Sequence, residues 1–344
     1  MPASLSIPTT LHRGQGSPLV AELSAAFDTI NDEPLLAALS AYRWTGRPGW
    51  SVRALWRSYV ASFVLNHGTT NDLIRRLQDD AELRDLCGFD ALPSRWTFNR
   101  FVSRLSHHPE LVEQAIAGLS DRLAQALPDF GKGVAVDASV YRSWSNPNHD
   151  SDAEASFTRK KNSQGREQWF YGYKLHVAAD AKYEIPIIAS VTTASRADSQ
   201  ELLPLIHGAY RRHAWFAPEY VTADAGYDTV AISETLVRFM NVAPIIPIRN
   251  LPRKHAPDPE DKRHFPPIAR GSAEWKALYA TRQGVERCFS RLKQHRALDS
   301  HCRRGLRKVT IHALMSVLSM QAVAVVRAQS GDVERIREIA RKVA

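Results

Sequence analysis

The chain has 344 residues, 44% of them hydrophobic and 24% charged, so it is long enough for two domains or one large one and can bury a substantial core. Lys and Arg outnumber Asp and Glu by 45 to 36, an excess that favours a polyanionic partner. Three cysteines at no metal-ligand spacing argue against a disulfide framework and a zinc site, and they fit a reducing cytosol.

The N-terminal part of the chain is expected to be helical after a flexible tail. The tail, residues 1–20, lacks an apolar run of signal-peptide length. Residues 21–128 carry apolar side chains at helical spacing, for example Leu55, Tyr59 and Phe63. We therefore expect an all-helical domain there.

One stretch of this region, 88-GFDALPSRWTFNRFVSRL-105, has the pattern of a helix-turn-helix. Gly88 stands where one helix should end, and Ser94 where the next should begin. An apolar stripe would then be buried, leaving Arg95 and Asn99 among the outward residues that can contact a DNA major groove. A plain bundle helix with solvated arginines explains the pattern equally well.

The residues after Asp129 contain short runs rich in Val, Ile, Tyr and Thr, which are typical of strands. The runs are 133-GVAVD-137, 170-FYGYKLHVAAD-180, 185-IPIIASVTTAS-195, 220-YVTAD-224 and 243-APIIPI-248. Helical patterns lie at about residues 198–212, 229–240 and 275–294. The order predicts an α/β domain over residues 129–330, with a mixed sheet flanked by helices.

Four other segments are interpreted from composition. Residues 146–168 are polar and turn-rich, so we expect a long mobile loop with Lys160 and Lys161 near its tip. Residues 250–270 are rich in proline and should form an irregular insertion. Residues 309–326 approach membrane-span length, but polar side chains interrupt them, which favours a buried helix in a soluble protein. Residues 331–344 are expected to be a C-terminal tail.

Two acids end predicted strands, Asp137 in GVAVD and Asp224 in YVTAD. Sites form at the carboxyl ends of strands in open sheets with helical crossovers. A helix N-cap or a turn former is an equally good explanation for either acid alone. If the two strands are neighbours, however, both carboxylates converge on one edge of the sheet.

A third acid, Glu286, lies in a strongly basic segment. On a helix that turns about 100° per residue, Tyr279, Arg282, Glu286 and Lys293 would share one face. The simplest interpretation is a surface pair between Arg282 and Glu286, worth a few tenths of a kcal/mol. The alternative is a face that binds a polyanion, because nine bases accompany only two acids from residue 282 to 308. The bases are Arg282, Arg287, Arg291, Lys293, Arg296, Arg303, Arg304, Arg307 and Lys308.

Three carboxylates in one cleft repel one another unless a cation joins them, and hard oxygen ligands select Mg²⁺ or Mn²⁺. Two such ions about 4 Å apart can activate a water or a 3′-hydroxyl and stabilise the leaving oxygen of a phosphodiester. Glu286 would then bind metal, while Arg282 and Lys293 would meet phosphates. The sequence has no G-x-x-x-x-G-K-[ST] loop, so we expect no ATP requirement.

These residues carry a resemblance to a known family. The spacing Tyr279-x2-Arg282-x3-Glu286-x6-Lys293 resembles the Y-R-E-K signature of the DDE transposases of bacterial insertion sequences, of the insertion-sequence-four and -five groups. The segments 136-VDAS-139 and 223-ADAGYD-228 are similar to the surroundings of the family's two Asp residues, and 154-EASFTRKK-161 and 171-YGYKLH-176 are also similar. With the N-terminal helices, the resemblance covers about residues 20 to 327. The segment 139-SVYRSW-144 does not align, so Trp144 is interpreted as a core aromatic, with base stacking as the alternative.

The resemblance implies a ribonuclease-H-like catalytic domain after a helical DNA-binding domain. It also implies that Asp137, Asp224 and Glu286 are the catalytic triad and bind two Mg²⁺ or Mn²⁺ ions. Such enzymes bind the terminal inverted repeats of their element, hydrolyse a phosphodiester at each 3′ end and join that end to target DNA. The residues that we expect to contact DNA are Tyr279, Arg282, Lys293, Lys160, Lys161, Arg95, Asn99, Arg287 and Arg291.

Paired DNA ends imply a homodimer on double-stranded DNA, in the cytoplasm and without a membrane. Two other functions use the same fold. One is a DNA-binding regulator that has lost catalysis, and the other is a metal-dependent nuclease that does not transpose.

Overall fold

The structure is a computed structural model that describes residues 17–42, 49–161, 164–249 and 260–338. The first of two regions is helical, as expected for residues 21–128. It contains α1 (Pro18–Thr29), α2 (Glu33–Ser40), α3 (Val52–Val64), α4 (Thr70–Asp79), α5 (Ala81–Cys87), α6 (Arg95–Leu105) and α7 (Pro109–Ala126). Gly88 ends α5 in the left-handed conformation, with φ 88°, which favours glycine. The helix prediction for this region is confirmed, while residues 1–16 of the expected tail lie outside the description.

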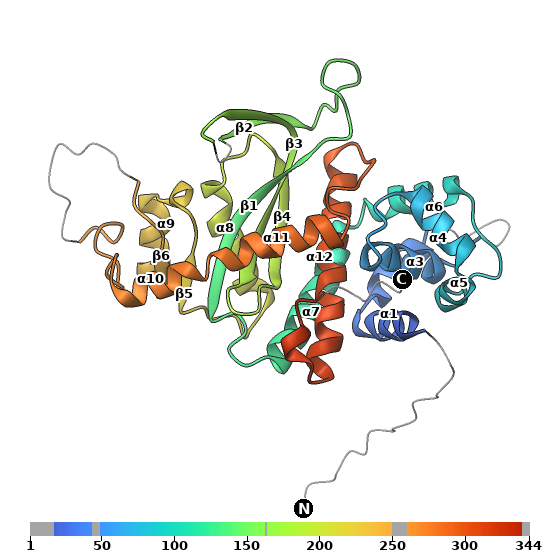
Figure 1. Cartoon of the computed structure of the whole chain (residues 1–344), viewed down its shortest axis with the longest axis horizontal. Helices are drawn as coiled ribbons and strands as arrows, with labels where there is room; N and C mark the ends of the chain where they lie inside the picture. Colours follow the sequence, from blue (N-terminus) through green and yellow to red (C-terminus); the bar gives the residue numbers. More distant parts are fainter. Residues whose placement is uncertain (1–16, 43–48, 162–163, 250–259, 339–344) are drawn as a thin grey trace, which may run out of the picture.

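The second region is built on a mixed sheet of six strands, which confirms the predicted architecture (Figure 1). The strands are β1 (Gly133–Arg142), β2 (Ser156–Lys161), β3 (Glu167–Asp180), β4 (Pro186–Thr193), β5 (Tyr220–Thr222) and β6 (Ala243–Ile245). Their order is β2-β3-β1-β5-β6, and β4 joins the same edge of β3 as β2, further along that long strand. The pairs β1–β5 and β5–β6 are parallel, and the others are antiparallel.

The expected loop over residues 146–168 is wrong in its second half, which forms β2 and the start of β3. Phe157 of β2 lies opposite Tyr171 of β3, with 5.0 Å between the ring centroids, and Arg159 pairs with Glu167 at 3.0 Å. This hairpin extends past the end of β1, which stops at Arg142. Little core covers it, so its residues are polar and no apolar run marks the strand.

Helices cover the sheet and join it to the N-terminal region. They are α8 (Ser199–Arg212), α9 (Val230–Glu234), α10 (Ala273–Ala280), α11 (Gln283–His295) and α12 (Leu306–Gln329), with the short turns η1 (Ala225–Tyr227), η2 (Thr235–Phe239) and η3 (Val333–Arg335). In the insertion, residues 250–259 lie outside the description, and residues 260–270 contain turns without a helix or strand.

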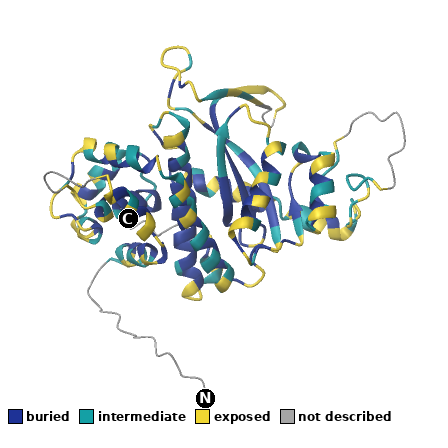
Figure 2. Ribbon diagram, turned by 180° about the vertical axis from the view of Figure 1, so that it is seen from behind, coloured by how far each residue is buried: buried dark blue, intermediate teal, exposed yellow. Residues whose placement is uncertain are grey.

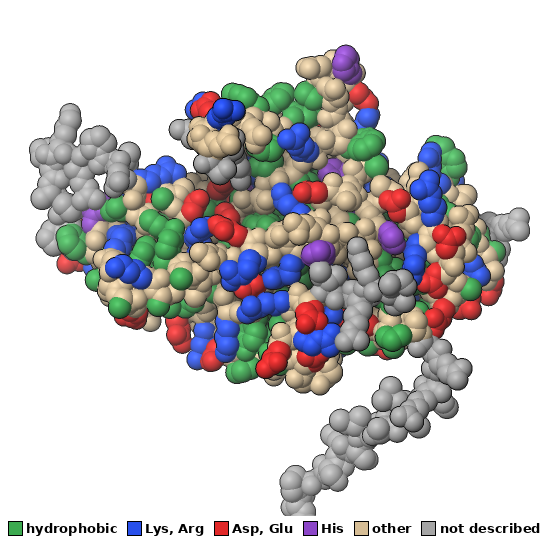
Figure 3. All heavy atoms as spheres, in the orientation of Figure 1, with side chains coloured by type: hydrophobic (Ala, Val, Ile, Leu, Met, Phe, Trp, Pro, Cys, Tyr) green, Lys and Arg blue, Asp and Glu red, His purple; other side chains and the backbone are tan. Residues whose placement is uncertain are grey.

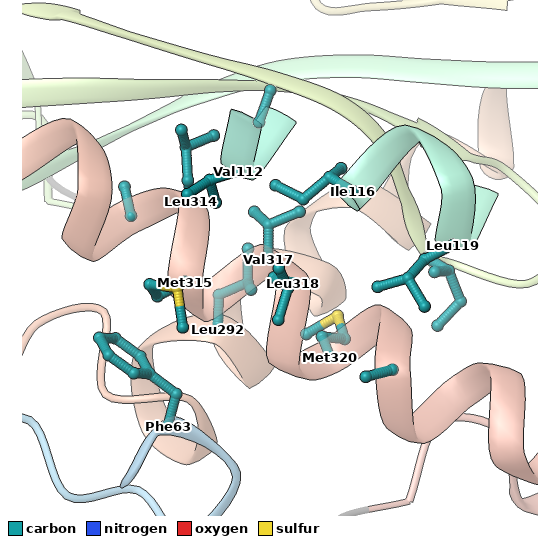
Figure 4. Packing of buried hydrophobic residues seen from close by; sticks show 14 of the residues in the cluster. Phe63, Val112, Ile116, Leu119, Leu292, Leu314, Met315, Val317, Leu318 and Met320 are labelled. Atoms are coloured by element: carbon teal, nitrogen blue, oxygen red, sulfur yellow. The ribbon is translucent and has the colours of Figure 1, made fainter. Parts of the chain in front are cut away.

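The long helix α12 lies between the sheet region and the N-terminal helices and contacts α1, α3, α7 and β4 (Figure 1). Among the described residues it is the one helix long and apolar enough to cross a membrane, but 89% of its apolar window is buried inside the protein. Burial is concentrated on this helix and on the central strands (Figure 2). Figure 4 shows Leu314 of α12 beside Val112 of α7 and Val317 of α12 beside Ile116 of α7. The prediction of a buried helix is therefore confirmed.

The last predicted helix, at about residues 275–294, is two helices. The backbone N–H groups of Arg282 and Gly284 bond three residues back, to Tyr279 and Thr281, so the chain makes a tight turn between α10 and α11. The Thr281 hydroxyl also donates to the Leu278 carbonyl at 2.7 Å, a side-chain bond that competes with helix continuation. The expectation of a single helix over these residues is wrong for this reason, although Arg282 still contacts both Tyr279 and Glu286.

Candidate active site

Asp137 and Asp224 come from neighbouring parallel strands. The register pairs Val134 with Val221 and Ala135 with Thr222, and continuing it by two residues places Asp137 level with Asp224. The pairing of β1 with β5 stops just before these residues, so both acids stand where the two strands separate.

The environments of the two acids differ. Asp137 is half-buried and does not end its strand, because β1 continues to Arg142 along β3, contrary to the sequence expectation. Asp224 is exposed directly after β5 and caps η1, where its Oδ1 accepts from the Gly226 N–H at 2.7 Å. Asp224 therefore does form a turn, as considered from the sequence, through its Oδ1 atom.

Several carboxylates gather around the buried side chain of Tyr227 at this edge of the sheet. Burial raises the pKa of the Tyr227 hydroxyl, and four nearby carboxylates raise it further. They are Asp137, Asp198, Asp224 and Glu201. Neither Asp198, which stands just before α8, nor Glu201, which lies in the first turn of that helix, was singled out from the sequence as a site residue.

Both missed acids are balanced by bases. Asp198 pairs with Lys174 at 2.7 Å, and Lys174 is itself buried, while Glu201 is only 9% exposed and pairs with Arg196 at 2.9 Å. The first pair joins β3 to the segment before α8, whereas the second is local, five residues apart at the start of α8. Each of these two acids is therefore neutralised by a base within the described chain.

The third predicted acid lies on α11, which packs against β1 and β3. Half of the Glu286 side chain is exposed, and its Oε1 lies 2.7 Å from Nη2 of Arg282. Burial works against the charge of Arg282, but the carboxylates of Glu286 and Asp137 more than offset it and raise the pKa of the guanidinium. Arg282 therefore interacts electrostatically with both Glu286 on α11 and Asp137 on β1.

The other two signature residues face the same region from either side of the turn. Tyr279 stacks on Trp275 with 4.8 Å between ring centroids, and the guanidinium carbon of Arg282 lies 5.7 Å from the centroid of the Tyr279 ring. Lys293 donates from Nζ to the Val140 carbonyl at 2.8 Å, which fixes α11 on β1. Basic and acidic side chains are interspersed on the face over α11 (Figure 3).

The chemistry of the acids fits a hard divalent cation, since all are carboxylates and two of them stand level on adjacent strands. Within the described parts of the chain, however, no three Asp, Glu, His or Cys side chains lie close enough together to hold a metal ion. The carboxylate of Glu286 is bound to Arg282. The donors are therefore chemically suitable, but the described carboxylates do not form a closed set of ligands.

The remaining predicted residues lie in three different places. Arg287 and Arg291 both bind Glu184, at 2.6 and 2.8 Å, and this carboxylate is only 2% exposed. Asn99 is half-buried on α6 and accepts from the Thr70 hydroxyl at 3.2 Å. Arg95 is exposed at the start of α6, whereas the side chains of Lys160 and Lys161 in β2 lie outside the description.

Trp144 was interpreted as a core aromatic, and this was wrong, because its side chain is 57% exposed after the end of β1. The neighbouring hairpin exposes two more large aromatics, Phe157 and Trp169. No alternation of apolar residues marks these positions in the sequence, because the segment leaves the sheet core.

Comparison with known proteins identifies the family of the chain. Residues 128–321 match the family described as the transposase DDE domain, and residues 13–104 match a second family described as a transposase domain. Among solved structures, the chain is similar to a piggyBac transposase in a synaptic complex with hairpin DNA, determined by cryo-electron microscopy. The identity is 14%, the match covers 94% of this chain and 79% of the other, and the TM-score is 0.46.

Proposed function

The chain belongs to the family of transposases with a DDE domain, and we propose that it binds the inverted repeats at the ends of an insertion sequence, cleaves the DNA there and joins it to a target. The observation that carries the proposal is the level placement of Asp137 and Asp224 on neighbouring strands, with Glu286 and Arg282 presented by a helix packed on the same sheet.

The proposed architecture has a helical DNA-binding domain at residues 21–128, whose first helix already begins at Pro18, and a ribonuclease-H-like catalytic domain at residues 129–330, against which the described residues 331–338 pack through the buried side chain of Ile336. The boundary between the two domains is supported by the order of the elements, because helices α1 to α7 are followed at Gly133 by the first strand of the mixed sheet. The antiparallel pairing of β1 with β3 and the parallel pairing with β5 are consistent with a ribonuclease-H-like sheet.

In this proposal Asp137, Asp224 and Glu286 hold two divalent cations, Mg²⁺ or Mn²⁺, which would supply an activated water or hydroxyl and stabilise the leaving oxygen. Oxygen from water attacks phosphorus at the transposon end, and the bond from phosphorus to the 3′ oxygen breaks. The freed 3′-hydroxyl then attacks a target phosphodiester and displaces the target's own 3′ oxygen. One P–O bond forms and one breaks in each step, so neither step needs a nucleotide cofactor.

The basic side chains have positioning roles. Arg282 and Lys293 hold phosphates beside the three acids, and Tyr279 supports Arg282 through its ring. Once a phosphate binds Arg282, the carboxylate of Glu286 loses its ion-pair partner and can turn to the other two acids. Arg287 and Arg291 both bind Glu184, so they would contact DNA only through guanidinium N–H groups that do not bond to this carboxylate.

The test uses a duplex that carries the DNA bordering the gene, together with a supercoiled target plasmid, in Mg²⁺ and in EDTA. We expect cut 3′ ends and joined target molecules in Mg²⁺ alone. Cut ends without joined products would indicate a nuclease, and specific binding without any cutting would indicate a regulator. Either result would contradict the proposed transposition.

A further inference from the structure

A basic cavity lies where the helical region meets α12, away from the three acids. Its volume is about 430 Å³, and its walls come from the start of α4, from α6 and from the segment that leads into α12. The charged and cysteine residues that line it are Arg95, Arg303, Arg304, Lys308 and Cys302. The cavity therefore joins elements that are about 200 residues apart in the sequence.

The residues that line the cavity carry positive charges and no negative ones, and the nearby acid Asp72 is in the first turn of α4. No acid is among its lining residues, and within the described chain Arg95, Arg303 and Lys308 form no ion pair, while Arg304 pairs with Asp150. The Nε of Arg303 is buried and has no hydrogen-bond partner among the described residues. An unpaired buried donor on a cation is costly, and the Arg303 guanidinium also lies beside the buried Tyr59 hydroxyl.

Neutral groups of the cavity also suit an anion. Thr70 and Asn71 stand in the first turn of α4, where backbone N–H groups have no acceptor within the helix. The positive end of the helix dipole adds to the charge of the arginines. Thr70 accepts from Nη2 of Arg303 at 3.3 Å, so the helix start and the cation are already in contact.

The walls of the cavity are fixed to each other by a tight junction. Asn66 donates to the Gln294 carbonyl at 2.9 Å and accepts from the Ala297 N–H at 2.8 Å, and buried Arg296 donates to the Val64 carbonyl at 2.9 Å. The first turn of α12 is held to the sheet region, because Gly305 donates its N–H to Asp152 at 2.8 Å. These bonds hold the cavity at a fixed distance from the sheet that carries Asp137 and Asp224, so an anion bound in the cavity would also lie at a fixed distance from these acids.

We propose that this cavity binds backbone phosphates of the DNA whose end is cleaved. The inference rests on the proposed function and adds a second anchoring point, remote from the acids. Arg95 then contacts a phosphate and does not read a base, which replaces the major-groove role considered for it. Because a phosphate contact is independent of sequence, the cavity strengthens binding to any duplex.

The first experiment measures affinity by fluorescence anisotropy in EDTA, for a duplex with the DNA bordering the gene and for an unrelated duplex. The variant Arg95→Ala with Lys308→Ala should bind both duplexes about tenfold more weakly, with a salt slope smaller by about two. The control Arg211→Ala removes an exposed charge at the far end of α8 and should leave both affinities unchanged.

The outcomes separate this inference from the proposed function. If the wild-type protein binds neither duplex, the proposed function fails. If the wild type binds and the double variant matches it, the cavity proposal alone is overturned. A loss confined to the bordering DNA would also overturn it, because it would indicate base reading by Arg95.

A second measurement places DNA in the cavity directly. Cys302 is exposed and lines the cavity, whereas Cys87 and Cys288 are buried, so alkylation by a maleimide followed by mass spectrometry reports on this position. Either duplex should slow the labelling of Cys302, and millimolar inorganic phosphate alone should not. Unchanged labelling with DNA, or equal protection by free phosphate, would contradict binding of a DNA backbone.

Discussion

At Arg282, the interpretation as one half of a structural ion pair and the interpretation as a phosphate-binding cation make the most different predictions. It binds Glu286 at 2.7 Å, and the carboxylate of Asp137 contributes to its raised pKa. A partly exposed pair of this kind contributes little to stability. A cation beside a cleaved phosphate, in contrast, stabilises charge that develops in the transition state.

Replacing Arg282 by Ala should therefore lower the single-turnover rate of DNA cleavage about 100-fold. The thermal midpoint should change little, because the lost pair is partly exposed. Lys276→Ala, which removes an exposed base from α10, is the matched control and should retain the full rate. A rate for Arg282→Ala within about twofold of wild type would exclude the proposed phosphate role.

A pH effect is expected from His312, which is fully buried and bonded through Nε2 to the Ala297 carbonyl at 2.7 Å. Burial lowers its pKa to about 3, from an ordinary value near 6.5. The unfolded chain takes up a proton first as the pH falls, so the stability that neutral His312 provides is present above about pH 6.5 and is lost between that pH and the lowered pKa.

The free energy of unfolding, measured in urea from about pH 7 to pH 4, should fall with acid for the wild type. His312→Gln should be less stable at neutral pH but should lose about 1.4 kcal/mol less per pH unit in the acid range. Equal pH slopes for the two proteins would show that His312 does not titrate in this way.

At the level of elements, α11 is held in place by a buried carboxylate. Glu184 follows β3 and accepts from Arg287 and Arg291, with Arg337 at 3.3 Å. Burial alone would raise the pKa of Glu184, but the three cations lower it overall. The stabilisation is therefore present at neutral pH and is lost as the pH falls through this lowered pKa.

Glu184→Gln should lower the free energy of unfolding by about 2–4 kcal/mol, because it leaves the arginines without their buried counter-charge. Glu219→Gln, at a largely exposed acid, should change it by less than about 0.5 kcal/mol. The measurement is urea unfolding at neutral pH. Similar losses for the two variants would contradict the anchoring role of Glu184.

The junction between α3 and α4 depends on a close backbone approach at Gly68. A Cβ there would lie 1.7 Å from the Ser300 carbonyl oxygen, so Gly68→Ala should destabilise the protein by about 2–3 kcal/mol. Gly118 is in the middle of α7 with open space around it, and Gly118→Ala should stabilise by about 0.5–1 kcal/mol. Thermal unfolding distinguishes these opposite signs, and a neutral Gly68→Ala would show that the two segments are not in contact.

The elements that the sequence predicted are those with a strong apolar period. The N-terminal helices and α8 follow from buried stripes, and the central strands from runs such as GVAVD. The strand β2 was missed, because SFTRKK lies beyond the core and has few apolar residues to mark it. The turn at Thr281 was missed too, since a side-chain bond to the Leu278 carbonyl leaves no periodicity signal.

Across the whole molecule, sequence reasoning placed three acids together but could not give their distances. The level placement of Asp137 and Asp224 depends on strand register, and the pairing of Glu286 with Arg282 depends on how α11 lies on the sheet. Asp198 escaped notice because its base, Lys174, comes from another element. The basic cavity escaped it for the same reason, since three separate segments form its walls.

The function of the whole molecule depends on whether Glu286 is a third metal ligand or only the partner of Arg282. The most direct measurement compares Glu286→Gln with Glu274→Gln, which alters an exposed acid on α10, in cleavage and in binding of the bordering DNA. We predict that Glu286→Gln folds and binds DNA with an affinity within about threefold of wild type, yet loses at least about 1,000-fold in Mg²⁺-dependent cleavage, while Glu274→Gln is fully active. Cleavage by Glu286→Gln at the wild-type rate would contradict the account.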